Sequence, residues 1–217
     1  MRQGQTALKA ARIPRYVWQY LAIMLLTQLL IFYPTRLLLP YLPAHRLETA
    51  LDAAIPLRAE WVVIYYLTFV YWAAGAVLLL AESREFARRL TMSYVFAMAV
   101  SCVVFLAYPT TMARPVPPDT GFFNALLAQL YEIDAPVHLM PSLHVLITYF
   151  ILRAAKGCRL FPKWFFPASA VFLVLVCLCI LFVKQHVVAD IPAGIVIAEL
   201  AVQLVLRRKE KEKERAV

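Results

Sequence analysis

Long apolar stretches alternate with short polar connections along most of the chain, and this pattern predicts helices that cross a membrane. A helix needs about 20 apolar residues to cross the ~30 Å hydrocarbon layer. The six stretches that fit are residues 17–39, 61–81, 92–108, 141–155, 166–183 and 187–206, of which the fourth is short. The first stretch is too long and too continuous for a signal peptide. We therefore expect an all-α integral membrane protein, a bundle of six transmembrane helices.

The basic residues give this bundle an orientation. Of the 22 lysines and arginines, 17 fall in the N-terminal segment, the second and fourth connections and the C-terminal tail, and five fall on the opposite side. Because basic residues are retained on the cytoplasmic side, we expect both termini in the cytoplasm. The predicted parts are a basic N-terminal segment (1–16), a membrane domain (17–206) and a charged tail (207–217). The opposite side is the outer face. We expect it to face the periplasm or the cell exterior, as in a protein of the cell inner membrane, or to face a lumen.

The composition supports the membrane interpretation. Apolar residues make up 63% of the chain and charged residues 16%, against roughly 25% charged in an average soluble domain. These values exclude an ordinary soluble enzyme, a disordered chain and a collagen-like fibre, and the five glycines argue against a glycine-rich nucleotide loop. The net charge of +9 then indicates orientation in a membrane rather than nucleic-acid binding. The four cysteines, Cys102, Cys158, Cys177 and Cys179, predict neither a disulfide nor a zinc site.

The connection between the third and fourth spans carries a further helical pattern. Asp119-Thr120 precedes the apolar-periodic stretch 121–131, and an Asp or Thr in this place is typical of a helix start. We expect either a short amphipathic helix at the membrane interface or an ordinary loop helix.

Three ionisable residues lie where a bilayer makes them costly, so each needs a reason. His144 falls one turn inside the outer end of the fourth span, and His186 begins the sixth span. Asp190 follows His186 by four residues and is expected on the same helical face. Arg114 in the preceding outer connection and Lys184 just before the sixth span add two cations on the same side of the membrane.

These residue types suit phosphoryl transfer through histidine. His186 would attack phosphorus with one ring nitrogen, while Asp190 holds the other nitrogen and stabilises the charge that develops. His144 would protonate the leaving oxygen as a general acid. Arg114 and Lys184 would neutralise the phosphate.

Helix N-termini would complete this phosphate site. The fourth and sixth spans both run inward from the outer face, so both N-termini point at the predicted site. Pro141 suits an early helical position, and Ser142 beside it offers a hydroxyl and a backbone N–H to the anion.

Each of these residues also has a structural interpretation. His144 would be an interfacial polar residue, and His186 with Asp190 a structural hydrogen-bonded pair. Arg114 would anchor a loop, and Lys184 would snorkel to the interface. Ser142, likewise, would only start a helix. Residues interpreted as interfacial or as packing between spans are His45, His138, Tyr65, Tyr66, Tyr71 and Trp72.

The order of these residues resembles the motifs of the type 2 phosphatidic acid phosphatase superfamily, K-x6-R-P, P-S-G-H and S-R-x5-H-x3-D. Arg114-Pro115 is similar to the end of the first motif, residues 140–144 (Met-Pro-Ser-Leu-His) to the second, and residues 186–190 (His-Val-Val-Ala-Asp) to the third. The motifs cover about residues 107–194, and the six spans extend the likeness to the whole chain. The resemblance implies a metal-independent reaction through a phosphohistidine or a directly activated acceptor hydroxyl.

Four motif positions differ. Ala107 stands at the lysine of the first motif, Leu143 at the glycine of the second, and Cys179 and Ile180 at the Ser-Arg of the third. Two phosphate-binding cations of the phosphatase pattern are thus absent, and Lys184 is a candidate to replace the arginine. This form is closer to the inositol phosphorylceramide synthase branch, and sphingomyelin synthases also keep the His, His, Asp set.

The leading hypothesis is an integral-membrane enzyme that acts on a lipid phosphate ester at the outer leaflet without a cofactor or a metal. It is either a lipid phosphatase, with water as acceptor, or a phosphotransferase, with a hydroxyl such as that of a polyol as acceptor. The absent cations favour transfer, and the short chain favours hydrolysis. The alternatives are a transporter or scaffold without catalytic activity, and a haem or quinone protein with two axial histidines.

Overall fold

The computed structural model describes residues 13–38 and 41–215 and is mostly helical. Arg2, Lys9 and Arg12 of the predicted N-terminal segment lie outside the described residues. The α-helices are α1 (Arg15–Leu38), α2 (Ala50–Ala54), α3 (Val62–Ala81), α4 (Arg84–Ala107), α5 (Phe122–Ile133), α6 (Leu143–Ala155), α7 (Phe165–Phe182) and α8 (Asp190–Arg215). A 3-10 turn, η2 (Ala59–Trp61), leads into α3, and the short strands are β1 (His45–Arg46) and β2 (Thr110–Thr111).

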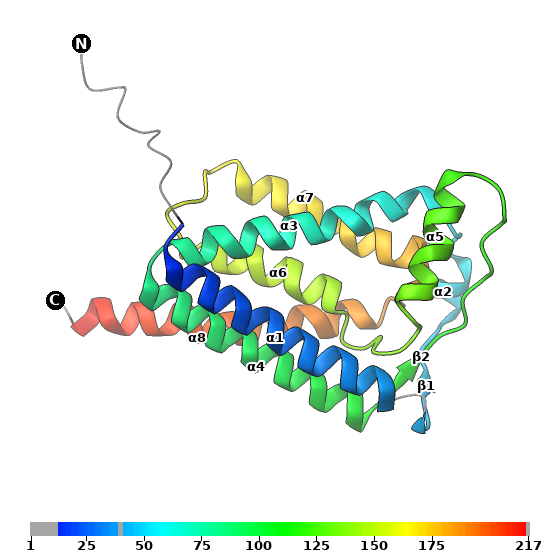
Figure 1. The fold of residues 1–217 in the computed structure, drawn as a ribbon, viewed down its shortest axis with the longest axis horizontal. Coiled ribbons are helices and arrows are strands. Elements are labelled where there is room, and N and C mark those ends of the chain that lie inside the picture. Colours follow the sequence, from blue (N-terminus) through cyan, green and yellow to red (C-terminus); the bar gives the residue numbers. More distant parts are fainter. Residues whose placement is uncertain (1–12, 39–40, 216–217) are drawn as a thin grey trace, which may run out of the picture.

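Six longer helices, α1, α3, α4, α6, α7 and α8, lie side by side and run in alternating directions (Figure 1). The start of α1 and the end of α8 lie at the same end of this bundle. The opposite end carries α2, α5, both strands and the connection between α7 and α8, and we refer to it as the loop end. The functional residues predicted from the sequence lie at the loop end or in its connections.

Four of the described helical segments are long and apolar enough to cross a membrane. They are Arg15–Leu38, Ala59–Ala81, Arg84–Ala107 and Phe165–Phe182. Helix α6 is apolar but has only 13 residues, which at 1.5 Å per residue is shorter than the ~30 Å hydrocarbon layer. The helices agree with the predicted all-α class, whereas the count of six spans and the side of each terminus stay predictions.

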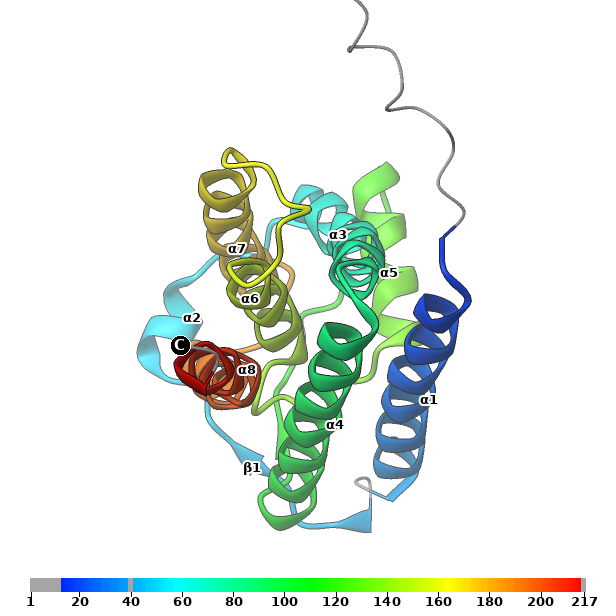
Figure 2. The same cartoon turned by 90° about the vertical axis from the view of Figure 1, so that its left-hand side faces the viewer.

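Helix α6 can be short because it lies in the centre of the bundle. All of its residues except Tyr149 and Arg153 are buried, and it packs against α3, α7 and α8 (Figure 2). In contrast, α1 buries only Val17, Met24 and Thr35 and lies at the periphery beside α4. Helix α6 therefore begins inside the bundle, where protein surrounds its first residues.

Helices α4 and α8 do not begin at the first residue of the predicted spans. Helix α4 begins at Arg84 rather than near residue 92, because Ser83 caps it by accepting a hydrogen bond of 3.1 Å from the backbone N–H of Phe86. Helix α8 begins at Asp190, not at residue 187, and continues through the predicted tail to Arg215. At the start of α4 and the end of α8, polar helical turns extend beyond the apolar stretch, so hydropathy alone does not mark these two helix ends.

The loop end contains one predicted helix and two features that the sequence analysis missed. The expected helix in the third outer connection is present as α5, with Gly121 at its N-cap in place of Asp119-Thr120. Gly121 has a φ of 90°, a conformation that favours glycine. Helix α2 and the parallel pairing of β1 with β2 were not predicted; the pairing joins His45 to Thr110 and so ties two distant connections together.

Candidate active site

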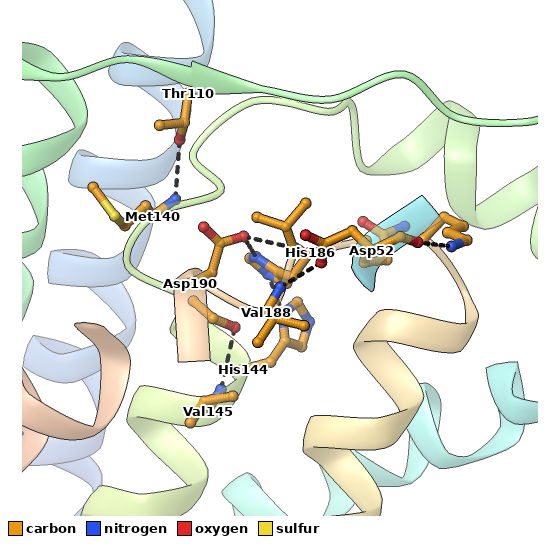
Figure 3. Close-up of polar contacts among 12 residues, drawn as sticks. Asp52, Thr110, Met140, His144, Val145, His186, Val188 and Asp190 are labelled. Carbon is orange, nitrogen blue, oxygen red and sulfur yellow. Dashed lines mark hydrogen bonds and ion pairs between the residues drawn. The ribbon is translucent and has the colours of Figure 1, made fainter. Parts of the chain in front are cut away.

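Three predicted residues meet where α6 and α8 begin. His144 is the second residue of α6, His186 lies in the connection between α7 and α8, and Asp190 is the first residue of α8 (Figure 3). Nδ1 of His144 lies 3.4 Å from Nε2 of His186, and Nδ1 of His186 lies 3.1 Å from Oδ2 of Asp190. All three side chains are buried. Two imidazoles and a carboxylate thus form one continuous chain of contacts.

The pairing of His186 with Asp190 has a different origin from the one predicted. Because α8 begins only at Asp190, the two residues do not share a helical face, and that argument was wrong. The connection instead turns back on itself. Oδ2 of Asp190 also accepts a hydrogen bond of 3.0 Å from the backbone N–H of Val187, and the Asp190 N–H donates to the Val187 carbonyl. An ionised carboxylate only accepts hydrogen bonds, so Nδ1 of His186 carries the hydrogen and Nε2 presents a lone pair toward His144.

Asp52 holds this connection from the other side, and the sequence analysis did not single it out. Its Oδ1 accepts a hydrogen bond of 2.8 Å from the backbone N–H of Val188 (Figure 3). Its Oδ2 accepts hydrogen bonds from the backbone N–H and the hydroxyl of Thr49, and the Asp52 N–H donates to Thr49 Oγ1, which completes a capping box at the start of α2. Burial alone would raise the pKa of Asp52, but these hydrogen bonds lower it below the usual value. The T-x-x-D spacing of Thr49 and Asp52 is the signal that could have found it.

Lys184 makes contacts that differ from those of a free phosphate-binding cation. Its Nζ donates to the carbonyl oxygens of Asp52, at 3.0 Å, and Ile55, at 2.5 Å, where α2 ends. The residue has a φ of 52°, so the backbone bends sharply just before His186. Burial lowers the pKa of Lys184, and the carboxylate of Asp52 opposes that effect. The ammonium has three N–H groups, and two of them bond to α2. Lys184 therefore braces α2 and still carries charge beside His186.

Arg114 joins three segments of the chain. Its Nε donates to the carbonyl of Lys184 at 3.0 Å, one Nη donates to the carbonyl of Asp134, and the other donates to Oε1 of Gln185. Its guanidinium also lies over the ring of Tyr131, 4.9 Å from the centroid. A guanidinium has five N–H groups, so two remain for a ligand. Arg114 thus lies beside the two histidines, and its guanidinium is held by backbone and side-chain acceptors of two other segments.

Ser142 is the N-cap of α6. Its Oγ accepts a hydrogen bond from the backbone N–H of Val145, and its own N–H donates to the carbonyl of Asp190 at 3.2 Å. The backbone N–H that was expected to face the anion therefore joins α6 to α8 instead. Gly194 makes this close approach feasible, since a Cβ there would lie 2.7 Å from the Ser142 carbonyl oxygen.

Two buried polar residues beside the histidines were not recognised as functional candidates. Gln185 is 2% exposed, and its Nε2 has no hydrogen-bond partner among the described residues. His138, interpreted from the sequence as interfacial, is only 5% exposed and lies against the rings of Phe32 and Phe105. Burial, assisted by the charge of Arg36, lowers the pKa of His138 to about 4. No pattern in the sequence distinguishes these two residues from ordinary loop positions.

Aromatic residues of α3 surround His144. The ring centroids of Tyr65 and Trp72 lie 4.6 Å and 5.5 Å from that of His144. The Tyr65 hydroxyl donates to Asp134 at 2.7 Å, and Trp72 Nε1 donates to Thr148 at 3.0 Å. These side chains, expected only to pack between spans or to lie at the interface, also form one wall of the site.

The two histidines separate cavities of different character. On the side of His144, an apolar cavity of about 280 Å³ shares Gln28, Phe69 and Trp72 with a second apolar cavity of about 500 Å³ that extends between α1 and α3. On the side of His186, a cavity of about 230 Å³ has charged walls that include Glu48. A small cavity of about 30 Å³ borders both histidines. The site therefore has an apolar approach and a polar approach.

The positions that depart from the phosphatase motifs carry no cation in the structure. Ala107 ends α4. Cys179 donates to the carbonyl of Trp61, and Ile180 is buried in an apolar cluster. Nothing in residues 13–38 and 41–215 groups three or more His, Cys, Asp or Glu side chains in a way that could hold a metal ion.

Comparison with known proteins gives one match. The family model described as the PAP2 superfamily matches residues 42–204, well over half of the chain, and this range includes His144, His186 and Asp190. No curated protein and no solved structure matches the chain.

Proposed function

The chain belongs to the PAP2 superfamily, and from this membership we propose that it is an integral-membrane enzyme that cleaves a lipid phosphate ester through a histidine nucleophile. The proposal includes six spans, cytoplasmic termini and a site at the outer face. It needs neither a metal nor a cofactor. The superfamily favours an enzyme over the transporter, scaffold and haem-protein alternatives.

The observation that carries this proposal is the contact chain from His144 through His186 to Asp190. Asp190 holds the hydrogen of His186 on Nδ1, so Nε2 is the nucleophilic nitrogen, and it faces the second imidazole. Buried imidazoles paired in this way, with one oriented by a carboxylate, suit a nucleophile and a general acid.

The first half-reaction then follows from the geometry. The phosphoryl group enters between the two rings, where it replaces the 3.4 Å contact of His144 Nδ1 with His186 Nε2. It then lies within reach of His186 Nε2. The lone pair of Nε2 forms the N–P bond, and the P–O bond to the lipid breaks with its electron pair on the leaving oxygen. His144, in its protonated form, gives that oxygen a proton. Asp190 stabilises the positive charge on the His186 ring throughout the step.

The phosphate would be bound by groups that lie around the two rings. Arg114 offers the two N–H groups that its anchoring contacts leave. Lys184 contributes positive charge and its third N–H, and the buried Ser142 contributes its hydroxyl hydrogen, since Oγ only accepts in its capping bond. These assignments replace the cations that are absent at positions 107 and 180.

The apolar cavities support a lipid as the leaving group. They begin at His144, the proposed acid, and continue between α1 and α3, where Trp18, Met24 and Ile147 are among the lining residues. A hydrocarbon tail placed there would be removed from water, at roughly 25 cal/mol for each Å² of apolar surface. The leaving oxygen would then lie beside the general acid, as the mechanism requires.

One specific observation favours a phosphotransferase as the second candidate. The form of the motifs, with Leu143 between Ser142 and His144 and without an arginine at position 180, is closer to inositol phosphorylceramide synthases. Such an enzyme would pass the phosphoryl headgroup to a polyol hydroxyl after the same first step.

The test uses the purified wild type and the His186→Ala variant, both in detergent with EDTA, and a panel of lipid phosphates with and without inositol. Free phosphate and new lipid products are followed together. Turnover by the wild type and none by a folded His186→Ala variant would support the mechanism, and His45→Ala serves as the matched control. Wild-type turnover in the His186→Ala variant would overturn the role of this histidine.

A further inference from the structure

The small cavity beside the catalytic histidines has two unsatisfied polar atoms on residues that line it. They are Nδ1 of His138 and Nε2 of Gln185, both buried and without a partner in the part of the chain that the structure describes. His144, His186 and Arg114 line the same cavity. A buried polar atom without a partner is costly, so a cavity with two of them is suited to a polar ligand.

The hydrogen bonds of Thr35 determine which nitrogen of His138 is free to accept. The Thr35 hydroxyl donates its single hydrogen to the carbonyl of Ile31 at 2.5 Å, one turn earlier in α1. Its oxygen lies 2.6 Å from Nε2 of His138, and with the hydroxyl hydrogen on that carbonyl we assign Nε2–H as the donor of this bond. The neutral ring therefore presents the lone pair of Nδ1 as an acceptor.

The contact with Arg114 determines the orientation of Gln185 in the same way. A guanidinium only donates hydrogen bonds, so the atom of Gln185 that it contacts must be the oxygen Oε1. The unpartnered atom is then the amide nitrogen, which donates. Residues that line the cavity thus carry one unpaired acceptor on His138, one unpaired donor on Gln185 and the imidazole of His144.

We propose that His138 and Gln185 hold the water molecule that hydrolyses the phosphohistidine, which makes this protein a lipid phosphatase rather than a phosphotransferase. The inference rests on the proposed function, because it assigns the second half-reaction of the same site. A water molecule has two hydrogens, one for Nδ1 of His138 and one for His144. Its oxygen accepts from Gln185 and keeps one lone pair for phosphorus.

The chemical step balances with these groups alone. The water oxygen forms a bond to phosphorus, and the bond between phosphorus and His186 Nε2 breaks with its electron pair returning to that nitrogen. The proton that water loses goes to His144, which gave up its own proton to the lipid oxygen in the first step. The hydrogen held by His138 stays on the oxygen and leaves as part of the phosphate.

An alcohol fits this arrangement poorly for two reasons. It has a single hydroxyl hydrogen, so either His138 or His144 would lose its hydrogen bond. The cavity is also small, about 30 Å³ against about 230 Å³ to 500 Å³ for the other cavities described above, and a polyol is several times larger than water. Both reasons favour water as the acceptor.

The experiment separates the two half-reactions with a ³²P-labelled lipid phosphate in detergent, in the presence of glycerol as a competing acceptor. Rapid quenching gives the released lipid alcohol, the labelled protein, the free phosphate and any glycerol phosphate. The variants are Gln185→Glu, which keeps the acceptor for Arg114 but removes the donor, and His138→Leu, which removes the acceptor. His138→Asn is the conservative variant, since Asn carries a side-chain oxygen and tolerates the φ of 60° at this position. His45→Leu, at an exposed histidine stacked on Tyr108, is the matched control.

We expect the wild type to release phosphate and form no glycerol phosphate. In Gln185→Glu and His138→Leu, the first burst of lipid alcohol should persist while phosphate release slows about 10-fold or more and labelled protein accumulates. His138→Asn should recover part of the rate, and His45→Leu should behave as the wild type. Equal slowing of both half-reactions in the variants would overturn the proposal, because that is the result of a merely structural role.

Two further outcomes distinguish this inference from the proposed function. Transfer of the label to glycerol by the wild type as readily as to water would overturn the water site and leave the histidine mechanism in place. The absence of lipid alcohol, labelled protein and phosphate with every lipid phosphate would overturn both.

Discussion

The carboxylate of Asp52 accepts a hydrogen bond of 2.8 Å from the backbone N–H of Val188, a residue 136 positions further along the chain. Val188 lies between His186 and Asp190, so the bond fixes the connection that carries the proposed nucleophile. Lys184, just before His186, donates to the last carbonyls of the same short helix. Helix α2 thus acts as a clamp on both flanks of His186.

The first prediction concerns this clamp and its dependence on pH. Because the folded-state pKa of Asp52 is below the usual value of 3.8, its hydrogen bonds stabilise the folded state above that pH, and the contribution is lost as the pH falls through the lower folded-state value. Asp52→Asn should therefore lower the unfolding free energy near neutral pH by about 1–3 kcal/mol. The difference in Tm between the two proteins should shrink on acidification below pH 3.8. Asp119→Asn, on an exposed loop residue, is the control, and a difference that grows toward low pH would contradict the prediction.

Asp190→Asn tests the orientation of the nucleophile. The amide of asparagine can donate to Nδ1 of His186, which would move the ring hydrogen to Nε2 and remove the attacking lone pair. We expect kcat to fall by about 100-fold or more, with little change in KM. Steady-state kinetics with a lipid phosphate check this result. Wild-type kcat in a folded variant would show that Asp190 does not set the tautomer.

Arg114→Lys tests the anchored guanidinium. A lysine keeps the charge but cannot reach Lys184, Asp134 and Gln185 together while two N–H groups remain for phosphate. We expect kcat/KM to fall by about 10- to 100-fold, which corresponds to the loss of one or two charge-assisted hydrogen bonds. Arg88→Lys, in an exposed ion pair with Glu85 at the start of α4, is the matched control. Equal activity of the two variants would contradict a phosphate-binding role for Arg114.

Gly194→Ala tests the close approach of α6 and α8. The added Cβ would lie 2.7 Å from the Ser142 backbone oxygen, which cannot rotate away, so the two helices that carry His144 and Asp190 must separate. We expect a loss of about 1–3 kcal/mol in stability and a clear loss of activity. Gly75→Ala is the matched control, because the nearest atoms to its added Cβ, the closest at 2.7 Å, belong to the side chain of Ile151 rather than to a backbone. Full activity in Gly194→Ala would show that this spacing is not required.

Ala73→Phe tests the apolar cavity as the tail site. Ala73 lines the cavity of about 500 Å³, and a phenyl ring there would fill part of the space for a hydrocarbon chain. We expect turnover of long-chain lipid phosphates to fall by about 10-fold, with little effect on a short-chain phosphate that does not reach the cavity. Ala74→Phe, on an exposed neighbour that does not line the cavity, is the control. An equal loss for long and short chains would contradict the assignment.

The sequence identified His144, His186 and Asp190 as candidates, but the reason it gave for the contact between His186 and Asp190 was wrong. His186 and Asp190 were paired on the assumption of one helix, yet α8 begins only at Asp190 and the contact comes from a turn. The pair could be found because ionisable residues are rare and costly in an apolar chain. His138 and Gln185 could not be found, because their significance lies in burial and unpaired atoms, which no local pattern encodes.

The sequence by itself determined the helical class, the apolar stretches and the His, His, Asp set, because hydropathy and residue chemistry are properties of the chain taken locally. The tertiary structure decided which atoms face one another. In the folded chain Lys184 donates to the end of α2, Arg114 donates to the carbonyl of Lys184, and the Ser142 N–H donates to the first residue of α8. The tertiary structure also placed the apolar and polar cavities on opposite sides of the two histidines. These relationships join residues up to 132 positions apart, and such distances are closed only when the helices pack.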